Sequence, residues 1–89
     1  MTRYTIEYDK PVLKDLKAIR NKRLAAILRS AINDLADDPR PPGVKKLVGH
    51  RDLWRIRVGD WRVVYRVEDA RLVVVIVAGG GRGGVYGVV

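Results

Sequence analysis

The chain of 89 residues is long enough for one domain with a modest core, and its 47% of hydrophobic residues excludes a disordered chain. It has no cysteine and one histidine, which excludes a disulfide framework and a zinc site, and neither a metal nor a cofactor is expected. No apolar run approaches the roughly 18 residues that cross a membrane, which excludes a membrane span. The net charge of +8, with twelve arginines among eighteen basic residues, favours a polyanionic partner, either nucleic acid or an acidic protein.

The first element in chain order is a strand over residues 3–8, where polar and apolar residues alternate. This N-terminal stretch has no long apolar core and no cleavage site, which argues against a signal peptide and predicts a cytoplasmic protein. Asp9 stands at an N-cap position with Pro11 in the first turn, so a helix is predicted over residues 10–20. Its polar side carries three lysines that are either a solvated face or a contact for a phosphate backbone: Lys10, Lys14 and Lys17.

A second helix is predicted over residues 22–37, where apolar residues recur at helical spacing. It stops at the segment "DDPRPPG", because three prolines and a glycine prevent its continuation. The two helices form an α-hairpin, and its apolar stripe requires a sheet to pack against. The remainder of the chain is the only source of that sheet.

The second half of the chain predicts three strands after a loop. The loop covers residues 43–52 with one apolar anchor, Leu47, and the strands cover residues 53–58, 61–67 and 71–78. Both connections between the strands suit hairpins. The order β-α-α-β-β-β predicts one α+β domain over residues 1–89, an antiparallel sheet with both helices on one face, and a glycine-rich C-terminal segment at residues 79–89.

The stretch "LWRIRVGDWRVVYR" at residues 53–66 places arginines at alternate positions of two strands. With a two-residue turn at residues 59–60, Trp54, Ile56, Val58, Trp61, Val63 and Tyr65 face the helices, whereas Leu53, Arg55, Arg57, Arg62, Val64 and Arg66 face away.

This register makes Arg57 and Arg62 direct cross-strand neighbours. Like charges in such a pair destabilise a sheet by up to about 1 kcal/mol, and the outward positions hold no carboxylate that could neutralise them. The pattern therefore predicts a bound anion. The alternative is that solvated arginines splay apart and keep the sheet soluble.

The glycine-rich end "AGGGRGGVYGVV" at residues 78–89 holds two side chains with functional chemistry, Arg82 and Tyr86. Arg82 is a further cation near the end of the last apolar strand. The phenol of Tyr86 can stack on a base or exchange a proton. The alternative is a frayed tail in which Tyr86 is a surface aromatic residue.

Three segments resemble the RelE/ParE superfamily of bacterial toxins, within the RelE-like branch, and together they cover essentially the whole chain. They are the opening "YTIEYDKPVLKDLKAI", the block "KLVG" followed by "LWRIRVGDWRVVY", and the closing strand followed by an arginine and "VY". The resemblance implies a RelE-like fold and the toxin of a type II toxin–antitoxin system. It implies a ribosome-dependent endonuclease that cuts mRNA in the A site, where a ribose 2′-OH attacks the adjacent phosphate without a metal.

The resemblance also implies roles for five residues. Arg62 and Arg82 match positions that clamp the scissile phosphate, and Tyr86 matches an aromatic residue that stacks on the reacting nucleotide or takes a proton near it. Arg55 and Arg57 match strand positions that are often lysine or arginine and serve acid–base or electrostatic roles. Arginine has a pKa above 12, so Arg55 cannot simply replace a lysine base.

The expected partners are mRNA, the ribosome and an acidic antitoxin that forms a heteromeric complex with a toxin that is monomeric alone. Two other functions stay open: a ParE-like inhibitor of DNA gyrase that cleaves nothing, and an RNA- or antitoxin-binding module whose catalytic site has decayed. Further basic residues are expected to bind RNA: Lys10, Lys14, Lys17, Lys45, Lys46 and Arg66.

Overall fold

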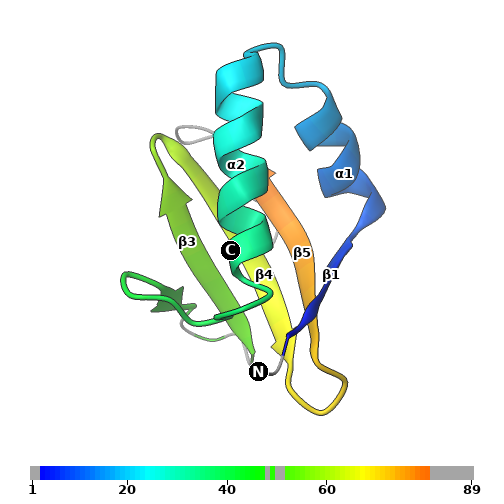
Figure 1. Ribbon diagram of the computed structural model, residues 1–89, viewed down its shortest axis with the longest axis vertical. Helices are drawn as coiled ribbons and strands as arrows, with labels where there is room; N and C mark the ends of the chain where they lie inside the picture. The colour runs from blue at the N-terminus through cyan, green and yellow to red at the C-terminus, as the bar shows by residue number, and fades with distance from the viewer. Residues whose placement is uncertain (1–2, 48, 50–51, 81–89) are drawn as a thin grey trace.

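A mixed β-sheet with two helices on one face makes up the described part of the protein, residues 3–47, 49 and 52–80 of a computed structural model (Figure 1). The strand order in the sheet is β1-β5-β4-β3-β2. The elements follow in the chain as β1 (Thr5–Tyr8), α1 (Lys10–Lys17), α2 (Lys22–Asp34), β2 (Lys45–Lys46), β3 (Leu53–Val58), β4 (Trp61–Glu68) and β5 (Val73–Gly80).

The α+β class and the order of the main elements are confirmed, and two details of the sheet differ from expectation. β1 pairs with β5 in parallel, whereas every other strand pair is antiparallel. The alternation of residues 3–8 predicts a strand but carries no information on which edge it joins or in which direction. The second difference is β2, which lies within the predicted loop 43–52 and pairs with β3.

Both helices are shorter than their sequence patterns suggest. α1 ends at Lys17, and Asn21 then caps the next helix by accepting a hydrogen bond from Leu24 N at 3.0 Å. α2 ends at Asp34, and the following backbone N–H groups bond to carbonyls three residues back, as in Leu35 to Ile32 at 3.0 Å. The chain therefore tightens into a turn before the prolines are reached.

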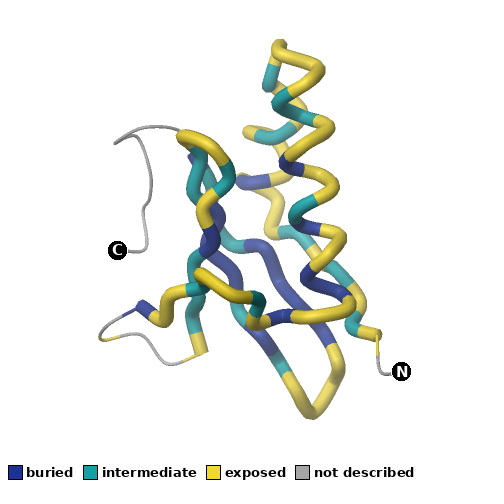
Figure 2. The backbone as a smooth tube through the Cα atoms, turned by 60° about the vertical axis from the view of Figure 1, so that its left-hand side comes forward, coloured by how far each residue is buried: buried dark blue, intermediate teal, exposed yellow. Residues whose placement is uncertain are grey.

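The hydrophobic core lies between the helices and one face of the sheet. Figure 2 shows buried positions recurring along α2 among exposed ones, as expected of an amphipathic helix. The members of the hydrophobic core are Val12, Leu28, Ile32, Leu35, Ile56, Val63, Tyr65, Val67, Val74 and Ile76. No helix in the described residues is long and apolar enough to cross a membrane.

Candidate functional site

β3 and β4 pair in the register that the two-residue turn predicts. Arg57 lies opposite Arg62, and Arg55 lies opposite Val64. The turn is possible because Gly59 has a φ of 60°, a conformation that glycine adopts without strain. The predicted like-charge pair is thus present in the structure.

The arginines of this hairpin project from the face of the sheet opposite the helices. Ile56, Val63 and Tyr65 are in the core, and successive side chains of a strand alternate between faces. We call the outward-facing set the arginine face: Arg55, Arg57, Arg62 and Arg66. Val64 lies among them, opposite Arg55, and is fully buried.

Arg66 differs from the other members of the arginine face because it has a carboxylate partner. Its Nη2 lies 3.3 Å from Oε2 of Glu68, two residues further along β4. Glu68 also pairs with Arg71 at 2.9 Å, and hydrogen bonds from Arg71 and Arg66 lower the pKa of the Glu68 carboxyl. Within the described residues, Arg55, Arg57 and Arg62 form no ion pair.

The like-charge pair is accommodated by a local hydrogen bond. Nε of Arg57 donates to the carbonyl oxygen of Gly59 at 3.1 Å. This bond draws the Arg57 side chain toward the β3–β4 turn. Arg57 is exposed, whereas Arg55 and Arg62 are half-buried.

β2 brings one of its two lysines, Lys45, to the arginine face, whereas the adjacent Lys46 lies on the other face of the sheet. Lys45 pairs with Arg55, and Lys46 pairs with Trp54. Nζ of Lys46 lies 5.7 Å from the centroid of the Trp54 ring, on the helix side of the sheet. Because adjacent strand residues face opposite ways, Lys45 shares the face of Arg55. The sequence grouped the two lysines together, and the register separates them.

A set of contacts that the sequence did not reveal holds the segment before β2 against the sheet. The buried hydroxyl of Tyr65 donates to the carbonyl oxygen of Pro39 at 2.7 Å, and burial raises the pKa of this phenol. Arg40 lies 5.1 Å from the centroid of the Trp54 ring and bonds to both oxygens of Asp69, at 3.3 and 2.9 Å. These partners are 26 and 29 residues apart in the chain, so local sequence patterns carry no signal for them.

Other residues singled out in the sequence are not part of this cluster. Lys10, Lys14 and Lys17 are exposed on α1, in the helical layer, and line a shallow depression with Leu13. The structure does not bring them to the arginine face. Arg82 and Tyr86 lie outside the described residues, as does the single histidine, His50.

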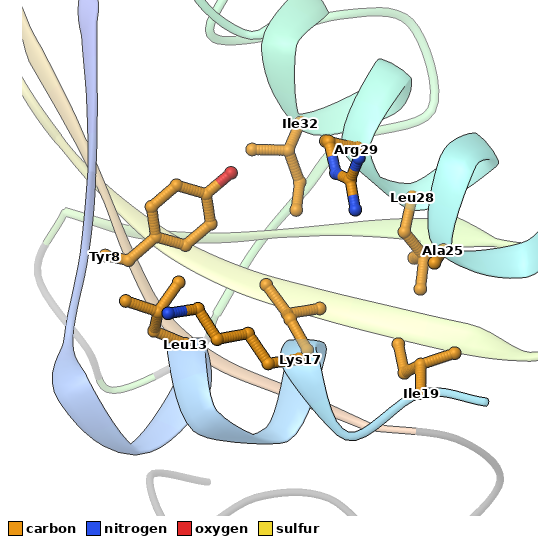
Figure 3. Close-up of a pocket in the computed structure, with 9 residues that line it drawn as sticks. Tyr8, Leu13, Lys17, Ile19, Ala25, Leu28, Arg29 and Ile32 are labelled. Atoms are coloured by element: carbon orange, nitrogen blue, oxygen red, sulfur yellow. The ribbon is translucent and has the colours of Figure 1, made fainter. Parts of the chain in front are cut away.

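An apolar groove of about 280 Å³ lies between α1 and α2, also on the helix side (Figure 3). Burial raises the pKa of Tyr8, which contributes to it from the end of β1. Lys17 and Arg29 are its charged members. The rest of its lining is apolar: Leu13, Leu16, Ile19, Ala25, Leu28 and Ile32.

The sequence matches the family described as ParE toxin of type II toxin–antitoxin system, parDE, over residues 6–83. It is 32% identical to RelE1 of Methanocaldococcus jannaschii over 77 residues, which are 82% of this chain and 84% of that protein. The family match covers both helices, the arginine hairpin and the last described strand.

Three solved structures are similar in fold. A chain of the RelE–RelB complex of Pyrococcus horikoshii has a TM-score of 0.79 and 31% identity, covering 96% of this chain and 100% of that one. A chain of the RelBE2 toxin–antitoxin complex of Mycobacterium tuberculosis has a TM-score of 0.74 and 29% identity, with 92% and 94% covered. The isolated RelE toxin of E. coli has a TM-score of 0.77 and 26% identity, with 93% and 90% covered.

Proposed function

This chain belongs to the RelE/ParE superfamily and is a toxin of the type II toxin–antitoxin class, and we propose that it is an endonuclease that cuts mRNA in the ribosomal A site. The substrate class is single-stranded RNA held by the ribosome. The reaction is attack by a ribose 2′-OH on the adjacent phosphate, which leaves a cyclic 2′,3′-phosphate and a 5′-OH.

The observation that carries this proposal is the unneutralised part of the arginine face. Arg57 and Arg62 are cross-strand neighbours, and Arg55 lies two residues from Arg57 on the same face. Three guanidinium groups without an ion pair in the described part of the chain offer a site for the phosphates of a polyanion. A phosphate diester fits, because the planar guanidinium group matches its oxygens with two parallel hydrogen bonds.

The chemistry of 2′-OH attack agrees with such a site. Negative charge builds up on the non-bridging oxygens as phosphorus becomes five-coordinate, and fixed cations stabilise that charge more than the charge of the ground state. Arg62 supplies this stabilisation in the proposal, together with Arg55 and Arg57. Arg82 completes the phosphate clamp, and Tyr86 stacks on or exchanges a proton with the reacting nucleotide.

The remaining basic residues have the subordinate role of binding RNA beyond the scissile phosphate. The exposed lysines of α1 and the two lysines of β2 carry charge available for backbone phosphates, whereas Arg66 is already paired with Glu68. Such contacts depend strongly on salt concentration.

An acidic antitoxin is the proposed protein partner, because relatives of this chain are known in complexes named RelE–RelB and RelBE. The net charge of +8 favours such a partner electrostatically. We place the protein in the cytoplasm, where its ribosomal target is found.

Induced expression followed by mapping of mRNA 5′ ends tests the proposal. We expect new 5′ ends within coding regions, in phase with codons, that disappear with Arg62→Ala. Intact mRNA accompanied by growth arrest and DNA damage would support the other candidate, a gyrase inhibitor, which the parDE family match favours. Intact mRNA with normal growth would show that the site has lost its function.

A further inference from the structure

The arginine face stabilises charge but lacks a group suited to proton transfer. Departure of the 5′-oxygen requires a proton, and a guanidinium group with a pKa above 12 gives one up poorly. Resting on the function proposed above, we propose that Lys45 is the general acid that protonates the 5′-oxygen leaving group. The role falls to a residue of β2, outside the arginine hairpin.

The register of β2 places Lys45 beside the proposed phosphate site. Directly opposed residues of an antiparallel pair have Cβ atoms roughly 5 Å apart, so Lys45 and Arg55 are immediate neighbours. Lys45 is exposed, and in the described residues its side chain has neither a hydrogen-bond nor an ion-pair partner. Its ammonium group is therefore available to a ligand held by the arginines.

The other proton-exchanging side chains described on this face are poorly placed for the role. Glu68 lies six residues along β4 from Arg62, roughly 20 Å away, and as a carboxylate bonded to two arginines it accepts protons without donating them. Glu7 lies on β1, three strands from β3 in the sheet order, a separation of roughly 14 Å.

The contacts on the helix side of the sheet hold the Lys45 backbone in place. Lys46 packs its ammonium group over Trp54, and the N–H of Leu47 donates to the carbonyl oxygen of Leu53 at 3.0 Å. Arg40 contacts the same Trp54 ring at 5.1 Å. A general acid acts only when it is well positioned, and this anchoring fixes the backbone from which the Lys45 side chain extends.

The step balances without a further reagent. The 2′-oxygen forms its bond to phosphorus and loses its proton to a solvent water, while the bond between phosphorus and the 5′-oxygen breaks. Lys45 transfers a proton from Nζ to that 5′-oxygen, which leaves as a hydroxyl group. The neutral amine then takes a proton back from solvent, which restores the ammonium group for the next turnover.

The test uses Lys45→Arg, which keeps the positive charge and removes the capacity to donate a proton. Cleavage by the full-length protein is measured on ribosome-bound mRNA with either the natural 5′-oxygen or a sulfur at the bridging position of the scissile phosphate. Sulfur leaves as a thiolate and needs no proton. The matched control is Lys22→Arg, the same change at an exposed lysine at the start of α2.

We expect Lys45→Arg to cleave the oxygen substrate about 100-fold or more slowly than the unmodified protein, and to cleave the sulfur substrate at nearly the same rate as that protein. Lys22→Arg should match the unmodified protein on both. A normal rate on the oxygen substrate, or an equal loss on both substrates, would overturn the role of Lys45 as an acid. Rescue by sulfur in Tyr86→Phe but not in Lys45→Arg would assign the proton to Tyr86. Failure of the unmodified protein to cleave either substrate would instead overturn the proposed nuclease itself.

Discussion

The β4–β5 turn and the β3–β4 turn lie at opposite ends of the sheet (Figure 1). Both ends carry arginines, and they differ in what those arginines contact. At the β3–β4 end, Arg55, Arg57 and Arg62 have no carboxylate partner among the described residues. At the β4–β5 end every ion pair of the described residues is found: Arg3–Asp37 at 2.6 Å, Arg40–Asp69 at 2.9 Å, Arg66–Glu68 at 3.3 Å and Arg71–Glu68 at 2.9 Å.

This difference shows that the position of the acidic residues decides which arginines are structural. Glu68 and Asp69 follow one another at the β4–β5 turn and neutralise arginines from three parts of the chain. Exposed pairs of this kind contribute little individually, but the Arg40 contacts also order the segment that leads to β2. The arginines of the other end keep their charge, and the proposed function uses that charge to bind phosphate.

The largest expected effect is on the rate of mRNA cleavage. It distinguishes the unpaired end of the sheet, at the β3–β4 turn, from the paired end, at the β4–β5 turn, where the arginines have carboxylate partners. Arg62→Ala should reduce mRNA cleavage by about 100-fold or more, because one fixed donor to the transition-state charge is lost. Arg71→Ala removes an arginine of the paired end and should leave the cleavage rate close to normal. Single-turnover cleavage of ribosome-bound mRNA measures both. Equal losses in the two variants would mean that overall charge, and not the β3–β4 end, controls the reaction.

The next effect is on the free energy of unfolding and concerns the buried hydrogen bond from the Tyr65 hydroxyl to the Pro39 carbonyl oxygen. Tyr65→Phe leaves the Pro39 carbonyl without its partner and should lower the free energy of unfolding by about 1–3 kcal/mol. Tyr8→Phe is the matched control, because the Tyr8 hydroxyl has no hydrogen bond in the described residues. Urea denaturation measures both. A loss in Tyr8→Phe as large as in Tyr65→Phe would contradict the importance of this bond.

A smaller effect is expected when the unpaired end is given a carboxylate. Arg62→Glu converts the like-charge pair with Arg57 into an opposite-charge pair and should raise the free energy of unfolding by up to about 1 kcal/mol. Arg62→Gln separates loss of repulsion from gain of attraction. The same glutamate should abolish cleavage. A lower free energy of unfolding in Arg62→Gln than in the unmodified protein would show that the pair is not repulsive in the native protein.

The smallest effect is a pH dependence of the paired end. Hydrogen bonds from Arg40 and then Tyr4 lower the pKa of Asp69. A carboxyl whose folded pKa is lowered contributes stability above its unfolded pKa of about 3.9, and this contribution is lost as the pH falls through the folded pKa. When the pH is lowered from 6 to below about 3.9, the free energy of unfolding should therefore fall less in Asp69→Asn than in the unmodified protein. Urea denaturation of both proteins at each pH measures this difference. Equal losses in the free energy of unfolding would argue against the linkage.

Sequence patterns predicted the arginine hairpin well because its register is determined by residues that are close together in the chain. A two-residue turn and strict alternation leave one register that turns both tryptophans toward the helices, and that register places Arg57 opposite Arg62. β2 was missed because its two residues, Lys45 and Lys46, have low strand propensity and no alternation that could reveal a face. Its existence depends on pairing with β3.

The amino-acid sequence by itself determined the fold class, the two faces of the hairpin and an excess of positive charge on one of them. These properties follow from residue order and from the two-residue period of a strand. The tertiary structure alone decided that Arg40 meets Asp69 and that Lys45, and not Lys46, joins the arginine face. Those outcomes depend on contacts between residues far apart in the chain, such as Arg40 with Asp69, and no periodicity in the sequence encodes such contacts.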